Sequence, residues 1–451
     1  MASAVLGYKW KECTITPHTE DGKGEKKGFD LTNSIMWMDY FEDILQPAVT
    51  ASITVTNVYG LVSQLPIRGG ESVDMVLNSP FGSVNSDDTF EVTMYVYKVT
   101  GVEAEGTKET FILHLISLEH FSNESTRCMK KYFPKVKISD HVKDIIDGVL
   151  YGGNKENRKE AHIEPTSNTY GFIGCSRKPF HAITWLGAKG ISTIAKKSGV
   201  SGGGKEGENK GTSGYLFFET QAGYHFKSID SIVAGVEIGS RKLKKVKFKY
   251  FYKGKIIDAA TLTNDLKIIN FEYEKNIDFR KALSVGMYAN DTYIYNSVTN
   301  KLHRFEYALQ EETKHPGAKL GKQNKYFVKS EYAKTPTRVF YRMTDHGVLA
   351  TDGTLPDSGR DEGDIAKSFS RYNILFTQAL NILVPCNTKL CVGDVIHCEF
   401  PKTEGGETTE PDDEVSGNYV IREVRHHFSA NQNTSSLKLM RDSYGLYGPD
   451  E

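Results

Sequence analysis

Hydrophobic and polar residues alternate in several stretches of the first 118 residues, and this pattern predicts β-strands. In residues 51–55, apolar Ala51, Ile53 and Val55 alternate with serine and threonine, which is the period of a half-buried strand. Strands that follow one another without helices favour a barrel or a sandwich. The other strands expected in this range are 72–77, 90–99 and 110–118, and the expected turns are 80–82 and 101–108.

The chain between residues 119 and 240 changes to a mixed pattern of helices and short strands. Apolar residues at helical spacing follow Ser139, which can cap a helix, and Pro179 suits the first turn of a second helix. A glycine-rich, charged stretch at 198–214 has too few apolar residues to contribute to a core. We therefore expect a small α+β unit here. Its expected elements are helices over 139–150 and 180–191 and a hairpin of strands over 215–219 and 224–229.

From about residue 241 the pattern returns to strands. Lysine alternates with apolar residues in 245–252, as in an edge strand or a solvated strand. The region 314–364 reads as loop-rich, 365–380 as a helix, and the acidic residues of 401–415 indicate exposure. A β block therefore precedes and follows the α+β unit, and we expect four units with limits 1–118, 119–240, 241–364 and 365–451. The other expected strands are 268–274, 282–295, 301–308, 381–385, 395–400, 417–427 and 435–441.

Composition indicates a folded protein of several domains. The 451 residues correspond to roughly three domains at about 150 residues each. The 56 basic and 57 acidic residues give a formal net charge of -1, which argues against a protein whose main task is to wrap nucleic acid. No stretch reaches the length of an apolar membrane span and no signal peptide is visible, so we expect no stable membrane insertion.

The six cysteines do not indicate a disulfide framework or a metal site. They are scattered along the chain, and a reducing cytosol during folding is the simpler interpretation. Cys386, Cys391 and Cys398 lie close in sequence with His397, but their spacing differs from the tight pairs of zinc sites. We expect these thiols to fill apolar space in strands.

Three further motifs contain residue types found in catalytic or ligand-binding sites, but none predicts a catalytic or cofactor-binding residue. Residues 199–205 match a phosphate-binding loop up to its lysine, but Glu206 replaces the serine or threonine that holds Mg²⁺, so we expect a flexible loop and no cofactor. His426 and His427 are neighbours in a strand, so one should point inward and one outward. Asp39, Glu42 and Asp43 could form a carboxylate pair for glycoside hydrolysis, but we expect them in an exposed loop or a subunit contact.

Four groups of residues occur in an order that resembles the baseplate central hub proteins of contractile-tailed phages of the T-even type. This family is related to the base of the type VI secretion spike. Each group consists of turn and core residues, and the resemblance rests on their combination over most of the chain. The groups are 40–44 with 47–49, 60–61, 65–67 and 69–71; 178–180 with 182–183, 185–186, 217–220 and 223–230; 390 with 392–396; and 416–421 with 424–428 and 434–442.

The resemblance implies a mainly β fold with an α+β insertion: two β-barrel domains similar to the tail tube, a small α+β domain and a C-terminal β-barrel region. It implies a homotrimeric, pseudo-sixfold ring that joins the hexameric tail tube, or a tube-initiator protein, to the trimeric central spike. Other baseplate proteins would be neighbours, and DNA and the tape-measure protein would pass through the channel without sequence-specific binding. The expected location is the virion tail baseplate, assembled in the host cytoplasm.

The subunit contacts are expected where the sequence indicates exposure, and no enzyme activity is expected. Two alternatives stay open: a spike-base component of another contractile injection system, and a cell-wall-cleaving baseplate enzyme, which a muralytic assay would detect. The residues expected to make assembly contacts are Asp39, Tyr40, Phe41, Glu42, Asp43, Pro47, Lys245, Lys247 and Lys249.

Overall fold

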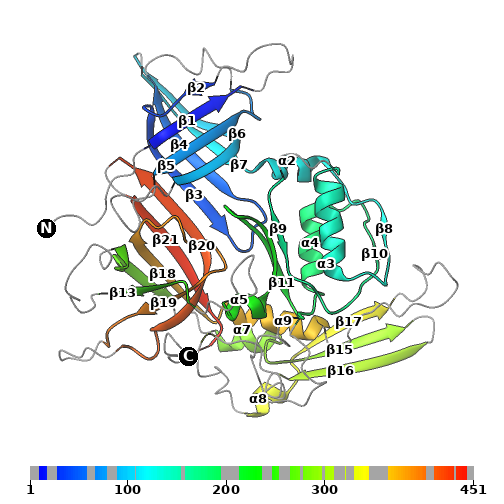
Figure 1. Ribbon diagram of the computed structural model, residues 1–451. Coiled ribbons are helices and arrows are strands. Elements are labelled where there is room, and N and C mark those ends of the chain that lie inside the picture. The colour runs from blue at the N-terminus through cyan, green and yellow to red at the C-terminus, as the bar shows by residue number, and fades with distance from the viewer. Residues whose placement is uncertain are drawn as a thin grey trace.

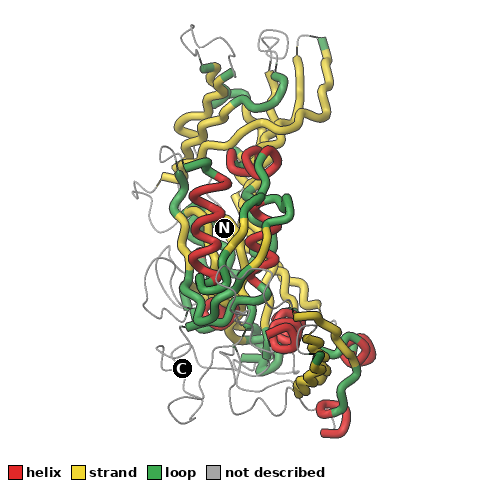
Figure 2. The backbone as a smooth tube through the Cα atoms, turned by 90° about the vertical axis from the view of Figure 1, so that its right-hand side faces the viewer, coloured by secondary structure: helices red, strands yellow, loops and turns green. Residues whose placement is uncertain are grey.

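The computed structural model has a mainly β fold with an α+β insertion, which confirms the expected fold class (Figure 1). Strands dominate the N-terminal and C-terminal parts of the chain, and most helices lie between them. Seen from the side, the helices occupy the middle and the lower part of the molecule, below the N-terminal strands (Figure 2). The described residues are 10–17, 28–57, 67–78, 89–106, 108–153, 158–193, 213–235, 246–252, 265–274, 278–296, 300–308, 320, 330–344, 364–402, 411–430 and 433–443.

A single 13-stranded sheet contains strands from both ends of the chain. Its two halves meet where β3 (Ile35–Asp43) pairs antiparallel with β20 (Gly417–Ser429). The N-terminal half also contains β1 (Trp10–Thr16), β2 (Phe29–Asp30), β4 (Thr50–Asn57), β5 (Ser72–Asn78), β6 (Thr89–Glu105) and β7 (Lys108–Ile116). The C-terminal half adds β13 (Phe248–Phe251), β14 (Asn270–Glu274), β18 (Gln378–Pro385), β19 (Val395–Glu399) and β21 (Asn433–Arg441).

Each half of this sheet packs its own hydrophobic core. The N-terminal core contains Val73 and Leu113, and the C-terminal core contains Leu380 and Tyr419. Phe428, near the end of β20, belongs to the N-terminal core, whereas the earlier apolar residues of β20 belong to the C-terminal core. The ranges 241–364 and 365–451 both contribute strands to the C-terminal half. The sheet is therefore continuous, while the apolar packing is divided into two β blocks.

The α+β insertion has a third core of its own. Pro179 begins α4, which confirms the first-turn proline, because its fixed φ suits a position where no N–H is needed. The helix expected after Ser139 forms, but its second half is a π-helix, and its N-cap is Lys137. The elements are α2 (Leu118–Ser125), β8 (Lys131–Tyr132), α3 (Ile138–Asp144), η1 (Ile145–Leu150), β9 (Ala161–Ile163), β10 (Phe172–Ile173), α4 (Pro179–Gly187), β11 (Tyr215–Thr220), β12 (Gly223–Ser228) and α5 (Ile229–Val233).

A small separate sheet lies beside α9 at the lower right of Figure 1. Its order is β16-β15-β17, with β15 and β16 antiparallel and β15 and β17 parallel. Phe340 of β17 contacts Phe369 of α9 edge to face, with ring centroids 5.2 Å apart. The elements of this region are α7 (Phe279–Ser284), β15 (Ala289–Asn296), β16 (Lys301–Ala308), α8 (Ser330–Lys334), β17 (Arg338–Thr344) and α9 (Asp364–Leu375).

Several expected boundaries differ from the structure, including the end of the second helix, which lies at Gly187 instead of residue 191. The turn expected at 101–108 is wrong because β6 continues to Glu105, and register shifts against β7 absorb the irregularity that Gly101 introduces. The strand expected over 282–295 begins only at Ala289, because Asp278 caps helix α7 by accepting from the Lys281 N–H. The loop-rich range 314–364 contains β17, and the helix expected over 365–380 ends at Leu375. The turn at 80–82 lies outside the described residues.

The described helices include none with the length and apolar character needed to cross a membrane.

We predict that Phe428→Ala lowers the free energy of unfolding by about 3–5 kcal/mol, because it removes a fully buried ring from the N-terminal core. Phe279→Ala is the matched control, since that ring is 40% exposed on α7 and should cost much less. Urea unfolding followed by circular dichroism measures both. Equal losses in the two variants would contradict the assigned role of Phe428.

Candidate functional site

The acidic segment at 39–43 lies in β3, in the middle of the large sheet between β4 and β20. The exposed loop expected there is wrong. Asp39 is 7% exposed, Tyr40 1% and Glu42 2%. These side chains therefore make their contacts within the chain.

Asp39 links β3 to β20 through an arginine and a histidine. The Arg425 guanidinium donates to both carboxylate oxygens, at 3.0 and 3.1 Å, and His427 Nδ1 lies 2.8 Å from Oδ1. Such a bidentate pair fixes geometry as well as adding energy. His427 is half-buried and His426 is buried, so the two histidines do face opposite sides as expected. Burial lowers the pKa of His426 to about 4, which keeps its ring neutral.

Glu42 joins three segments that are distant in sequence. Its carboxylate accepts hydrogen bonds from the Gln221 N–H at 2.9 Å, from the Val392 N–H at 3.1 Å and from the Tyr40 hydroxyl at 3.1 Å. Gln221 lies in the turn between β11 and β12, and Val392 lies between β18 and β19. Burial raises the pKa of Glu42 to about 7, although the three donors favour the ionised form.

Glu219 of β11 makes a reciprocal contact from the α+β insertion to the N-terminal block. It accepts from the Val49 N–H at 2.9 Å and from the Ser117 hydroxyl at 2.8 Å. Lys159 balances the charge, with its Nζ 2.5 Å from Glu219 and 3.0 Å from Glu119. Burial raises the pKa of Glu219, and Lys159 opposes that rise. One carboxylate from each module thus binds backbone of the other.

The remaining expected contact residues occupy several environments. Asp43 accepts from the Leu45 N–H at 2.8 Å, and Phe41, Asp43 and Pro47 are half-buried. Lys247 pairs with Asp394 at 2.7 Å; burial alone would lower the pKa of this lysine, but Asp394 raises it on balance. Lys249 lies half-buried in edge strand β13. Lys245 is outside the described residues.

The cysteines do not come together. The six thiols, all of which the structure describes, form no disulfide. Cys386 belongs to the N-terminal core and Cys398 to the C-terminal core, while burial raises the pKa of Cys391. Among the described residues, no group of three His, Cys, Asp or Glu side chains is arranged to hold a metal ion. The phosphate-loop match at 199–205 is outside the described residues.

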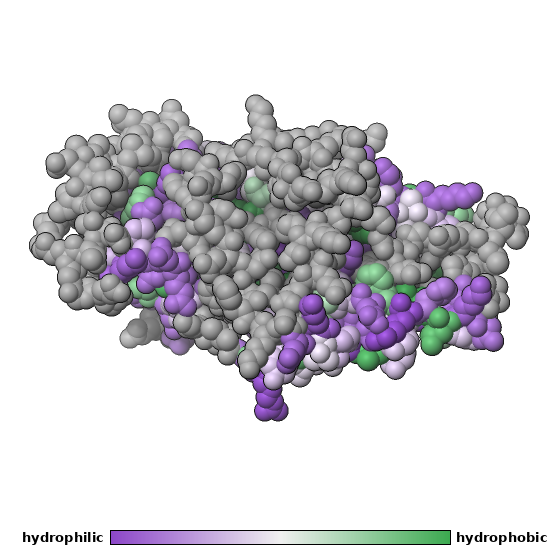
Figure 3. Space-filling view, turned by 90° about the horizontal axis from the view of Figure 1, so that it is seen from below, coloured by the Kyte–Doolittle hydropathy of each residue, from purple (hydrophilic) through white to green (hydrophobic). Residues whose placement is uncertain are grey.

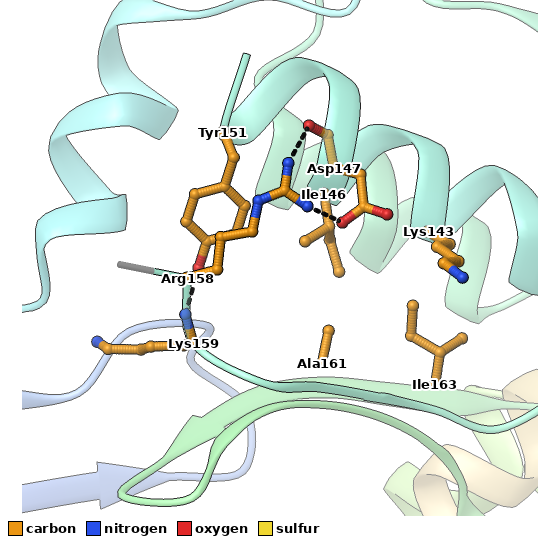
Figure 4. Close-up of a pocket in the computed structure, with 8 residues that line it drawn as sticks. All are labelled: Lys143, Ile146, Asp147, Tyr151, Arg158, Lys159, Ala161 and Ile163. Atoms are coloured by element: carbon orange, nitrogen blue, oxygen red, sulfur yellow. Dashed lines mark hydrogen bonds and ion pairs between the residues drawn. The ribbon is translucent and has the colours of Figure 1, made fainter. Parts of the chain in front are cut away.

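A pocket of about 330 Å³ lies between the α3–η1 helix and strand β9 (Figure 4). Arg158 stacks on Tyr151 and donates to Asp147 at 2.9 Å, and the lower wall is apolar. The lining contains no His, Cys, Ser or Thr. Its residues are Lys143, Ile146, Asp147, Tyr151, Arg158, Lys159, Ala161 and Ile163.

Two features of the structure were not predicted from the sequence. Lys159 and Glu219 gave no signal, because a buried ion pair between distant positions has no local pattern. Strand β17 lies in a range that was predicted to be loop-rich, although Val339, Tyr341 and Met343 alternate with other residues as in a strand. Tyr341 is 81% exposed, and hydrophobic residues appear among hydrophilic ones on the right of Figure 3, the side on which this sheet lies in Figure 1.

The chain was compared with protein families, with curated proteins and with solved structures. No protein-family model matches the chain. A curated relative, the probable baseplate hub protein gp334 of Vibrio phage KVP40, is 20% identical over 427 residues, which cover 92% of this chain and 91% of the relative. The chain thus resembles a phage baseplate hub protein, as its sequence motifs predict.

Solved structures show the fold that accompanies this resemblance. The tail protein from Neisseria meningitidis MC58 has a TM-score of 0.52 at 11% identity, with 97% of each chain covered. The 43 kDa tail protein of prophage MuSo2 from Shewanella oneidensis has a TM-score of 0.48 at 10% identity, with 96% of this chain and 98% of that chain covered. The fold shared with the Neisseria protein extends over almost the whole chain.

We predict that Glu42 gives the protein a pH-dependent stability. Its ordinary pKa is 4.5 and its folded pKa is about 7, so between these pH values the folded state binds more protons than the unfolded state. The free energy of unfolding therefore falls as the pH rises from 4.5 to 7, by on the order of 3 kcal/mol from this group. Glu42→Gln lacks this part of the slope, which urea unfolding at a series of pH values measures.

The control for that experiment is Glu272→Gln, an exposed carboxylate on β14. Its curve should run parallel to that of the wild type. A Glu42→Gln curve with the wild-type slope would contradict the assignment.

We also predict that Lys159→Met costs about 3 kcal/mol of folding stability, because it leaves the buried Glu219 and Glu119 without their cation. Lys130→Met is the control: Lys130 pairs with Asp144, but both side chains are nearly half exposed, so the loss should stay below about 1 kcal/mol. Thermal unfolding at pH 7 compares the two variants. Similar stability of both would show that Lys159 does not balance a buried charge.

Proposed function

We propose that this chain is a structural hub protein of a phage tail baseplate. Three copies would form a pseudo-sixfold ring that joins the hexameric tail tube to the trimeric central spike. The observation that carries the proposal is the combination of a hub-like sequence over 92% of the chain with two β blocks that have separate cores. No catalytic role is proposed for any residue.

Symmetry explains why two β blocks in one chain matter. A ring of three chains can match a sixfold tube only if each chain offers two similar faces to it. The N-terminal and C-terminal halves of the 13-stranded sheet are the candidates for these faces. Their continuity through β3 and β20 would hold the two faces at a fixed angle. In this proposal the α+β insertion at 119–240 is the spacer that braces them.

The proposed partners follow from this position. The tail tube or a tube-initiator protein would lie on one side of the ring, the central spike on the other, and further baseplate proteins around it. DNA and the tape-measure protein would pass through the channel. A formal net charge of -1 suits this task, because a strongly basic wall would retain the passing phosphate backbone. The virion baseplate would be the final location, after assembly in the host cytoplasm.

The buried residues of β3 change which side chains we propose as subunit contacts. Asp39, Tyr40 and Glu42 hold the sheet together from inside and would act on the ring indirectly. Lys247 is committed to Asp394. The proposed direct contacts are the partly exposed residues Phe41, Asp43, Pro47 and Lys249.

Sedimentation and low-resolution electron microscopy of the purified chain test the proposal. We expect a species of three chains, seen end-on as a ring with a central channel and three repeats, each with two lobes. The same ring should bind the tail-tube protein encoded with it. A monomer at high protein concentration with and without that partner, or a ring of another symmetry, would contradict the proposal.

A further inference from the structure

An exposed knob of apolar and basic residues lies at the outer end of the α+β insertion, around β8 and β10. Three of its apolar side chains are unusually open to solvent: Met129 is 72% exposed, Phe133 49% and Ile173 46%. Neither the fold nor the proposed ring explains this exposure so far. We define the basic knob as Met129, Lys131, Phe133, Lys135, Lys137 and Ile173.

The strand register places the centre of the knob on one face. Lys131 pairs with Ile173 across β8 and β10, so these two side chains lie on the same side of the ladder. Phe133 follows this strand, and the Lys131 ammonium lies over its ring, whereas Tyr132 and Phe172 stack on the inner side with ring centroids 4.3 Å apart. The inward aromatic pair anchors the ladder, and the outward face stays uncovered within the chain.

Positive charge surrounds this apolar centre. Residues 125–137 contain five lysines or arginines and no acidic residue. Lys130 pairs with Asp144, but in the described part of the chain Lys131, Lys135 and Lys137 have no ion pair. Lys131 lies 5.7 Å from the centre of the Phe133 ring. An apolar centre with a charged rim is the usual build of a protein-binding surface.

The complementary charge occurs elsewhere in the same chain. Residues 404–414 contain six acidic residues and no lysine or arginine. The structure describes 411–414, between β19 and β20, where Asp413 lies 3.7 Å from Lys402 and its side chain is 73% exposed. In Figure 1, β19 lies at the left of the molecule and β8 and β10 lie at the far right, so the two charged regions belong to opposite sides.

We propose that the acidic segment 404–414 of one copy docks on the basic knob of the next copy. This inference rests on the proposed ring and names the contact that closes it. Surfaces on opposite sides of a chain that fit each other generate head-to-tail contacts, and such contacts close into a ring when the rotation allows. The opposite charges would guide the approach and set the register, and the apolar centre would exclude water.

A nucleic acid is the competing ligand for a surface in which lysines alternate with aromatic residues. Two observations favour the second copy. The chain as a whole carries no basic excess, and its own acidic segment is opposite in charge to the knob. The most exposed knob residue is Met129, an apolar side chain that a phosphate backbone does not need.

Charge reversal tests the contact on the full chain. Lys131→Glu with Lys135→Glu and Lys137→Glu should weaken trimer formation by about 10-fold to 100-fold in sedimentation, because like charges then face each other. Asp412→Lys with Asp413→Lys and Glu414→Lys should weaken it in the same direction. Combining both sets in one chain should restore the trimer, since the knob and the segment then attract each other again with reversed signs.

The matched control reverses three exposed lysines outside the knob: Lys281, Lys301 and Lys334. This variant should form trimers as the wild type does, and circular dichroism should show all variants folded. A wild type that forms no trimer would overturn the proposed ring itself. A normal trimer in the knob variant, or no recovery in the combined variant, would overturn the docking contact alone. Loss of DNA binding in a knob variant that remains trimeric would assign the knob to nucleic acid.

Discussion

The pairing of β3 with β20 is the constraint on which the rest of the structure depends. It joins residues that lie 386 positions apart, as in the Asp39–Arg425 pair, and turns two β blocks into one sheet. Closing so long a loop carries an entropic cost, which the strand ladder and the buried contacts must offset. The contacts of Asp39 with Arg425 and His427 fix the register of this seam, because a slip by one residue would send these side chains to the opposite face.

Buried carboxylates hold the α+β insertion against this seam. Glu42 receives a backbone N–H from the insertion, and Glu219 of the insertion receives a backbone N–H from the N-terminal block. Each carboxylate satisfies donors that a turn would otherwise leave unpaired, and an unpaired buried donor is costly. The two contacts are not equivalent in charge: Lys159 balances Glu219, whereas Glu42 relies on N–H and hydroxyl donors. The junction therefore resists sliding of the modules while it retains one titratable group.

Local patterns predicted many of the strands, but not what the acidic residues do. Alternation at 51–55 and 72–77 is enough to define a strand, because one face must meet a core. At 39–43 the same reading suggested exposure, since carboxylates without a visible partner are normally solvated. The partners of Glu42 are backbone N–H groups of Gln221 and Val392, and a backbone group leaves no mark in the sequence. Long-range pairing, rather than residue type, determined this part of the structure.

The proposed hub between a tube and a spike would need rigid chains and contacts that form in one orientation. The continuous sheet and its buried carboxylates supply rigidity within a chain, where low dielectric strengthens each hydrogen bond. Between chains, solvent-exposed charge contributes little affinity but rejects wrong orientations, because like charges repel. Separation of the basic knob from the acidic segment would thus disfavour a symmetric two-chain contact, in which each patch meets its own copy. Buried contacts would thus stabilise the fold of each chain, and the charged surfaces would favour a head-to-tail contact with the next copy.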